Sequence, residues 1–197
     1  MLKERPRERY LTAEEANKIL EKADRWLKPI IHTFLGTGAR RADLLGHRLG
    51  RDPLTWKDVD LDEATITFQA TKEGKPRRLP LSADLIAILK PLRSRFKRGP
   101  VFLDDRKKPV TSERALDRFK AAAKAAKISN YENVRLHDLR HTAASWMVQK
   151  GVPLYEVSKV LGHRTIQMTE RYSHFASDHL TSAVNTLAAA LNQPAKK

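Results

Sequence analysis

The chain has 197 residues, 41% hydrophobic and 31% charged, which is typical of a soluble globular protein with one domain or at most two small ones. It has no cysteine, which excludes a disulfide framework, a thiolate metal site and thiol catalysis, and it has no apolar run of membrane-spanning or secretory-signal type. The 38 Lys and Arg against 23 Asp and Glu give a formal net charge of +15, which favours a nucleic acid partner over a merely basic soluble protein.

An N-terminal arm and a first helix are predicted at the start of the chain. Residues 1–10 are charged and show no periodicity, which is typical of a linker or an arm. A capping-box pattern at residues 12–15 is followed by apolar residues at helical spacing, which predict a helix as far as Leu27. Pro29 is expected to end or restart this helix, and a short apolar segment follows at residues 30–35.

A short helix, a loop and a small sheet are predicted next. Residues 41–45 have a helical pattern, whereas residues 46–53 contain two glycines, a proline and several charged residues, which indicates a loop. Strand-forming residues separated by turn chemistry predict short antiparallel strands at residues 56–60, 64–69 and 77–81.

The second half of the chain is predicted to be mainly helical. Capping residues, helical spacing and two glycines that act as helix stops predict helices at residues 82–96, 111–127, 137–150, 154–161 and 177–191. We therefore expect an α+β fold that is mainly α. Residues 11–192 would form one domain with a small three-stranded antiparallel sheet, and residues 193–197 would form a disordered tail.

Histidines and arginines concentrate in the last third of the chain. His137 and Arg140 are three residues apart and project from one face of a predicted helix, and His163 follows. A histidine near neutral pKa can donate, accept or carry charge, and the arginine fork matches phosphate oxygens, so this set suits a phosphodiester. The pattern alone leaves an alternative equally open, in which these histidines cap helices or lie on the surface.

A zinc site is a second alternative for the histidines. His137 and His141 have a zinc-compatible i,i+4 spacing, and His163 is a candidate third ligand. However, no glutamate lies between the first two, as the metalloprotease motif requires, and the nearby arginines would repel a dication. We therefore expect no metal.

Three segments, in order, resemble the signature boxes of the tyrosine recombinases, the phage integrase family. Residues 37–44, with a Thr-Gly-x-Arg turn leading into a helix, resemble the first box. Residues 71–81 resemble the family's β-hairpin with its catalytic lysine, and residues 137–144 resemble the second box. Leu161-Gly162-His163 and a tyrosine nine residues later, Tyr172, complete a pattern that covers nearly the whole chain. The resemblance implies the fold of the DNA breaking-rejoining enzymes.

The resemblance also implies a role for each matching residue. Tyr172 would attack the scissile phosphate and stay joined to the 3′ end, and because a free tyrosine has a pKa of about 10 it would need a proton acceptor. Arg40 and Arg140 would bind the non-bridging oxygens. His137 would be the general base or a proton relay, and His163 would hydrogen-bond the phosphate.

Three further residues have supporting or less specific assignments. Lys72 would be the general acid that protonates the leaving 5′ oxygen, although Lys75 lies in the same turn and hairpins are often basic simply because they face solvent. Asp43 would position Arg40 rather than touch DNA, with a plain acid at a helix N-terminus as the alternative. His141 is expected to support the residues that contact DNA without contacting DNA itself.

The implied function is site-specific DNA recombination through a covalent 3′-phosphotyrosine intermediate. Exchange of one phosphate ester for another conserves the bond type, so no cofactor is expected. Two alternatives stay open, a type IB topoisomerase-like enzyme that relaxes DNA without exchanging strands and a DNA-binding module that no longer cuts. A covalent adduct on a nicked DNA substrate would separate the second alternative from the other two readings.

The expected partner is double-stranded DNA, on which the family assembles as a homotetramer, often exchanging C-terminal segments. The chain departs from the family pattern in two places. Residues 46–53 look like an insertion, and the residues before Tyr10 are too few for the family's N-terminal core-binding domain. We therefore expect a catalytic fragment that is monomeric in solution, comes from a cytoplasmic bacterial or phage-encoded protein and has no membrane partner.

Overall fold

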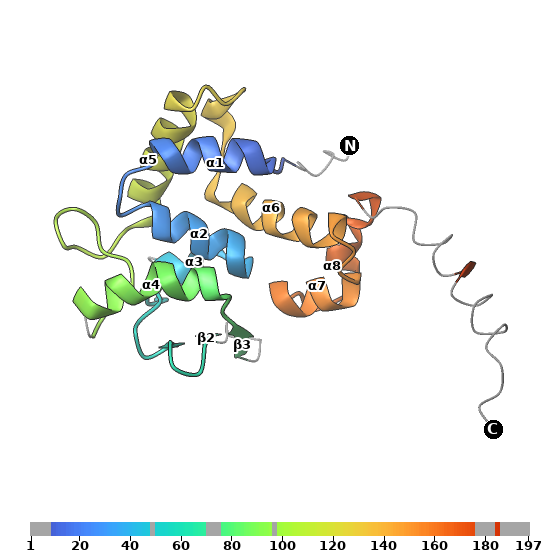
Figure 1. Cartoon of the computed structure of the whole chain (residues 1–197), viewed down its shortest axis with the longest axis horizontal. Coiled ribbons are helices and arrows are strands. Elements are labelled where there is room, and N and C mark those ends of the chain that lie inside the picture. The colour runs from blue at the N-terminus through green and yellow to red at the C-terminus, as the bar shows by residue number, and fades with distance from the viewer. Residues whose placement is uncertain (1–8, 48–49, 70–75, 96–97, 176–183, 186–197) are drawn as a thin grey trace.

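The computed structural model describes residues 9–47, 50–69, 76–95, 98–175 and 184–185 (Figure 1). Its helices are α1 (Ala13–Lys22), α2 (Lys28–Thr37), α3 (Arg41–Leu45), α4 (Ala83–Arg95), α5 (Ser112–Ala125), α6 (Leu136–Gln149), α7 (Leu154–Leu161) and α8 (Gln167–Glu170), with 3-10 turns η1 (Tyr131–Asn133) and η2 (Ser173–Phe175). The strands β1 (Val59–Asp60), β2 (Thr65–Phe68) and β3 (Arg77–Pro80) form one antiparallel sheet in the order β1-β2-β3. The predicted mainly helical α+β fold with a three-stranded antiparallel sheet is thus confirmed.

Two helices that are distant in the sequence, α2 and α6, pack together at the centre of the domain. α1 packs on α5 at one side of this pair, and α4 with the small sheet lies on the other side (Figure 1). α7 packs against α6, and α8 packs against α7. This arrangement brings the C-terminal end of α2 next to α7, although more than a hundred residues separate them in the chain.

The first two helices meet at a break that the sequence pattern does not show. α1 ends at Lys22, so the predicted continuation to Leu27 is wrong, and α2 begins at Lys28. Pro29 lies in the first turn of α2, where a missing N–H removes no helical hydrogen bond. The restart expected at Pro29 is therefore confirmed. The apolar residues 30–35 belong to α2 and supply several of its buried side chains.

The sheet turns an apolar face to the interior. Ile66 on β2 pairs with Val59 on β1 and with Leu79 on β3, and all three side chains are buried. Side chains alternate along a strand, so Arg77, two residues before Leu79, points to the same inner face. Residues 70–75, which connect β2 to β3, lie outside the described residues.

The other predicted elements agree with the structure where it describes them. The predicted helix 154–161 is α7, and Gly162 ends it in a left-handed conformation. The predicted loop 46–53 contains no helix in its described part, where His47 and Arg51 form an isolated bridge. The predicted C-terminal helix and tail lie almost wholly outside the described residues. None of the described helices is long and apolar enough to cross a membrane.

A small cluster of buried apolar residues surrounds the segment after α7. Ala144 and Val148 of α6 pack with Val157 and Leu161 of α7, and Tyr172 completes the cluster with 4% of its surface exposed. Burial of apolar surface contributes about 25 cal/mol per Å² to stability. The position of the Tyr172 ring is therefore fixed by packing against two helices.

Residues 10 and 11 connect the start of the domain to α6 and to the segment after Tyr172. The backbone N–H of Leu11 donates to Thr142 Oγ1 at 2.9 Å, and Trp146 Nε1 donates to the Leu11 carbonyl oxygen at 3.0 Å. The Tyr10 ring lies edge-on to the Phe175 ring, with 4.8 Å between the ring centroids. We call residues 10 and 11 the entry segment.

Candidate active site

The first box forms the turn between α2 and α3. Gly38 ends α2 with a φ of 58°, and a Cβ at this position would lie 2.6 Å from a methyl carbon of Leu161. Arg40 follows in an extended conformation at the start of α3, and its backbone N–H donates to the Asp43 carboxylate at 2.9 Å. Asp43 thus holds the backbone from which the Arg40 side chain projects.

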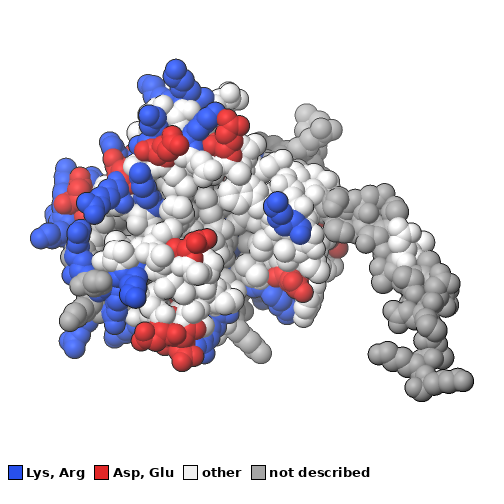
Figure 2. All heavy atoms as spheres, viewed as in Figure 1, with Lys and Arg blue, Asp and Glu red and all other residues white. Residues whose placement is uncertain are grey.

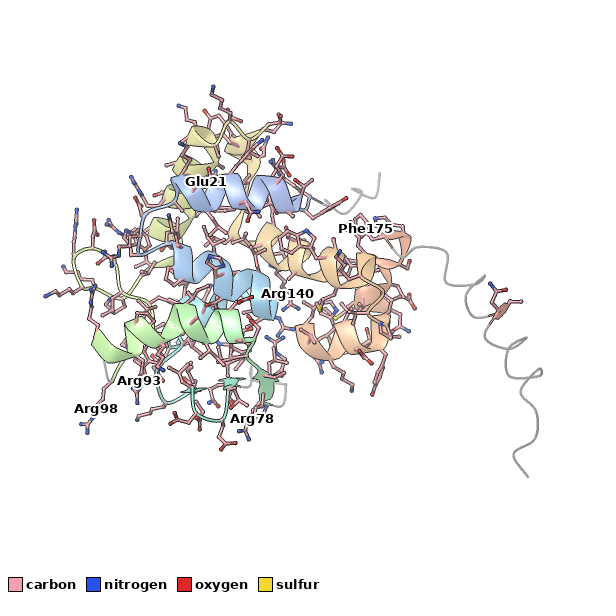
Figure 3. The ribbon with its side chains drawn as sticks, viewed as in Figure 1. Glu21, Arg78, Arg93, Arg98, Arg140 and Phe175 are labelled. Atoms are coloured by element: carbon pink, nitrogen blue, oxygen red, sulfur yellow. The ribbon has the colours of Figure 1, made fainter. Side chains whose placement is uncertain are left out.

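Arg40 and Arg140 are each held by a glycine at a helix C-terminus. Arg140 Nη1 donates to the Gly38 carbonyl oxygen at 2.7 Å, and Arg40 Nη2 donates to the Gly162 carbonyl oxygen at 2.6 Å. Both glycines are left-handed caps, where helix carbonyl oxygens carry partial negative charge. Within the described ranges, neither guanidinium forms an ion pair with a carboxylate. Arg140 is 3% exposed and lies between the end of α2 and α7 (Figure 3).

A third arginine that the sequence analysis did not single out, Arg77 on β3, lies beside this pair. Its Nη2 is 3.3 Å from Asp43 Oδ2, while Arg51 Nη2 is 2.7 Å from Asp43 Oδ1. Nε and Nη1 of Arg77 are buried without a hydrogen-bond partner in the part of the chain that the structure describes. Burial lowers the pKa of Arg77 to about 10, with Asp43 opposing this effect and Arg40 adding to it. The sequence feature that could have identified Arg77 is its position two residues before Leu79, because residues two apart on a strand face the same side of the sheet.

Gly162 is the position where these arginines approach α7. Its φ is 66°, its carbonyl oxygen accepts from Arg40, and a Cβ would lie 2.9 Å from Arg77 Nη1. His163 follows directly, and its backbone N–H donates to the Ser158 carbonyl oxygen at 3.0 Å. A residue larger than glycine would therefore displace Arg77 or the turn that carries His163.

The phenol of Tyr172 contacts a histidine of α6. Its Oη lies 2.6 Å from Nδ1 of His141. His141, which was expected to support the site without touching DNA, therefore contacts the tyrosine directly. The ring of His137, one helical turn earlier, stands edge-on to His141 with 4.6 Å between ring centroids. The three side chains therefore form a continuous row from the tyrosine to the exposed start of α6.

The histidines of this cluster are neutral at neutral pH. Burial, followed by repulsion from Arg140 and Arg40, lowers the pKa of His163 to about 3. Burial, followed by repulsion from His137, lowers the pKa of His141 to about 4. Burial also lowers the pKa of His137, with Arg140 as the next cause. Each neutral imidazole has one donor and one acceptor nitrogen, and Nδ1 of His163 hydrogen-bonds the hydroxyl of the buried Thr169 at 2.7 Å.

The guanidiniums and the imidazole–phenol row adjoin each other. Arg140 interacts electrostatically with both groups. Burial lowers its pKa to about 9, the charge of Arg40 lowers this pKa further, and Tyr172 raises it. Seven of the eight candidate residues lie in the described part of the chain, and all seven belong to this cluster. Lys72, the eighth, lies outside the described residues. The cluster can offer hydrogen bonds and positive charge to one anion beside a phenol hydroxyl.

The described residues include no group of three His, Asp or Glu side chains that could hold a metal ion. Arg40, Arg77 and Arg140 supply positive charge at this place, and a guanidinium fork binds two oxygens of a phosphate at once.

Known proteins resemble this chain along most of its length. A model of the phage integrase family matches residues 9–179. The integrase of Salmonella phage P22 is 30% identical, over 88% of this chain and 45% of that protein. The solved catalytic domain of the integrase of bacteriophage HP1 superposes with a TM-score of 0.69 at 33% identity, over 89% of this chain and 93% of that one.

A lambda integrase dimer bound to a COC′ core site has the same fold, with a TM-score of 0.69 at 22% identity over 87% of this chain and 49% of that chain. The chain spans about half the length of the curated integrases that it matches, 45% of the P22 protein and 49% of the Haemophilus phage HP1 protein.

Proposed function

Since this chain belongs to the phage integrase family, we propose that it is the strand-cutting and rejoining part of a site-specific DNA recombinase. Tyr172 Oη attacks a DNA phosphodiester, forms a bond to the 3′ phosphate and releases the 5′ oxygen as a hydroxyl. The reverse attack, by the 5′ hydroxyl of another strand, rejoins the DNA. The observation that carries the proposal is the Tyr172 phenol lying at a cluster of arginines and neutral histidines.

Arg40 and Arg140 bind the non-bridging oxygens of the phosphate. Each guanidinium donates one hydrogen bond to a glycine carbonyl oxygen, so its orientation is set before DNA binds. Donors that are oriented in advance do not have to reorganise when charge develops on the phosphate oxygens. His163 adds a neutral donor beside them, and Asp43 keeps Arg40 in place through its backbone N–H.

The phenol proton needs an acceptor, and His141 is the nearest. In the DNA-free site, burial and then repulsion from His137 lower the pKa of His141 to about 4, which makes it a weak acceptor for a phenol proton. Bound phosphate offsets the arginine charge and raises the pKa values of the imidazoles. DNA therefore activates the acceptor, and His137 passes the proton onward.

The leaving 5′ oxygen takes a proton from Lys72, an assignment that rests on the resemblance of residues 71–81 to the family's β-hairpin. One phosphate ester replaces another, so the energy of the broken bond is kept in the phosphotyrosine. The residues named here supply the charge and the proton transfers of that exchange without a cofactor.

Residues 11–192 form one catalytic domain, and its substrate is double-stranded DNA. The lambda integrase dimer on its core site supports DNA as the partner. We propose that the full-length protein acts as a homotetramer in the cytoplasm, while this fragment is a monomer before it binds DNA.

A nicked duplex that carries the recombination site tests the proposal, because loss of the short 3′ piece traps the covalent adduct. We expect an adduct on a denaturing gel for the wild type and for Tyr155→Phe, an exposed tyrosine, and none for Tyr172→Phe. An adduct in Tyr172→Phe, or none in the full-length wild type, contradicts the proposal. Adducts, together with relaxation of a supercoiled plasmid but no joining of strands from two duplexes, would indicate a topoisomerase instead.

A further inference from the structure

A cationic hollow lies beside the candidate active site, between α3, α5 and α6. It has a volume of about 410 Å³. No acidic side chain lines it, and its lining residues are Arg41, Ser112, Leu116, Lys120, Arg135, Leu136 and His137. Three of these carry a permanent positive charge, and His137 also belongs to the imidazole–phenol row.

Lys120 differs from two other basic residues of its helix, α5. Arg114 and Arg118 on α5 pair with carboxylates, at 2.5 Å to Asp105 and 2.6 Å to Asp24. Lys120, on the helix face that it shares with Ser112 and Leu116 at four-residue spacing, forms no ion pair within the described ranges. The same holds for Arg41 and Arg135.

Unpaired like charges around one hollow repel each other, and this cost is offset only when an anion enters. The hollow is continuous with the catalytic cluster along the chain, because Arg41 follows Arg40 directly and His137 precedes Arg140 by one turn. A strand whose reacting phosphate lies at Arg40 and Arg140 would therefore have this hollow beside it.

We propose that this hollow binds a backbone phosphate of the same DNA strand, next to the phosphate that Tyr172 attacks. This flanking-phosphate site rests on the proposed function only in that DNA is the ligand. It positions the strand and carries no sequence information, because its contacts go to the backbone. Each phosphate that a protein neutralises makes the logarithm of the binding constant fall with the logarithm of salt concentration by about 0.9.

The test compares the salt dependence of binding to a short duplex of arbitrary sequence, followed by fluorescence anisotropy. Lys120→Gln and Arg135→Gln are expected each to weaken binding and to flatten the salt slope, by up to about 1 when both are combined. Lys22→Gln, at the exposed end of α1, removes the same charge away from the hollow and should leave the slope unchanged. Equal slopes for Lys22→Gln and Lys120→Gln overturn the proposal. Matched thermal unfolding midpoints show that the variants fold alike.

A second measurement distinguishes DNA from free phosphate as the source of the anion. Inorganic phosphate is titrated into the wild type while the amide NMR signals of Ser112 and Leu116 are followed. We expect shifts only at phosphate concentrations far above those at which the duplex binds. Saturation by inorganic phosphate at duplex-like concentrations would assign the hollow to a free anion and overturn the DNA assignment.

The outcomes also separate this site from the proposed chemistry. Tyr172→Phe should keep the full salt slope while it forms no adduct. If Lys120→Gln flattens the slope but the wild type never forms an adduct, the flanking-phosphate site stands and the cleavage proposal fails. If the wild type forms the adduct but Lys120→Gln and Lys22→Gln have equal salt slopes, the flanking-phosphate site is wrong and the cleavage proposal stands.

Discussion

On the outer surface of α1 and α5, Lys18, Arg114 and Arg118 each have a carboxylate oxygen within 3.0 Å, whereas Arg40 and Arg140 in the site bond to neutral carbonyl oxygens. Figure 2 shows Asp and Glu side chains among the Lys and Arg side chains on the face over α1 and α5. The carboxylate of Asp43 is shared by Arg51 and Arg77 instead.

The difference shows that one residue type serves two purposes in this chain. Exposed ion pairs contribute about 0.2–1 kcal/mol each and neutralise the surface locally. Arg40 and Arg140 keep their charge without a carboxylate partner among the described residues, and this charge adds to burial, the main cause, in lowering the pKa values of the neighbouring histidines. We expect substitutions on the outer surface to affect stability slightly and substitutions in the site to affect chemistry strongly.

The largest effect is expected for Arg140→Gln. Removal of its guanidinium should slow formation of the covalent DNA adduct about 10²–10³-fold, because an oriented donor to the reacting phosphate is lost. Arg118→Gln removes the same charge from the outer surface and should leave the rate of adduct formation unchanged. The rates are measured on a nicked duplex at saturating DNA. If Arg140→Gln slowed adduct formation only a few fold, the proposed difference between the arginines of the site and those of the outer surface would be wrong.

A smaller effect is expected for Gly162→Ala. The left-handed backbone strains any other residue by about 1–2 kcal/mol, and here the added Cβ would also lie 2.9 Å from Arg77 Nη1. Gly99→Ala is the matched control, since Gly99 has a φ of +81° and nothing within 4 Å of an added Cβ. Chemical unfolding should show a loss of about 1–2 kcal/mol in the control and a larger loss in Gly162→Ala. Adduct formation should fall only in Gly162→Ala, and equal effects on both measurements would mean that the contact with Arg77 has no role.

The pH dependence of stability should separate the regions further. His141 and His163 have folded pKa values of about 4 and about 3, below the ordinary 6.5, so only the unfolded chain binds their protons as the pH falls from 6.5. The free energy of unfolding should therefore fall between pH 6.5 and 4, by about 1 kcal/mol for each histidine once solvent screening is allowed for. Urea unfolding at several pH values measures this fall.

His163→Gln should reduce that fall, and an unchanged pH profile would contradict the assignment. The outer surface responds at lower pH. The hydrogen bond from Arg118 lowers the pKa of Asp24, so this pair stabilises the fold above the ordinary carboxyl pKa of 3.8 and loses its contribution as the pH falls through the lower folded value. Arg118→Gln should therefore leave the profile above pH 4 unchanged.

The smallest effect is expected for the ion pair between Arg118 and Asp24. Its two hydrogen bonds, of 2.6 and 2.8 Å, connect α5 to the turn after α1. A double-mutant cycle with Arg118→Gln and Asp24→Asn should give a coupling of about 0.2–1 kcal/mol that weakens with added salt. A coupling well above this range would show that the outer pairs hold the fold together.

Much of the fold could be predicted, because local signals agree with the packing. Helix α7 has the predicted bounds Leu154–Leu161, since a helical pattern is followed by a glycine that ends it. The break between α1 and α2 could not be predicted from spacing. Ala23 and Leu27 continue the apolar pattern and are buried, yet they lie in a turn whose course is set by packing.

For the site, the resemblance to the family's signature boxes predicted which residues would come together, while their contacts depend on packing. Arg40 meets the Gly162 carbonyl across 122 residues, and Arg140 meets Gly38 across 102. No local pattern predicts which carbonyl oxygen a guanidinium will reach. The same applies to Arg77, whose inward direction was visible but whose neighbours were not. The chemical roles themselves stay predictions until the variants are measured.

The entry segment couples the start of the domain mechanically to its tyrosine. The Tyr10 ring touches Phe175, three residues after Tyr172, while Leu11 is bonded on both sides to α6. A displacement of the entry segment would therefore reach the site by two routes, through Phe175 to the segment of Tyr172 and through Leu11 to α6, the helix that carries Arg140.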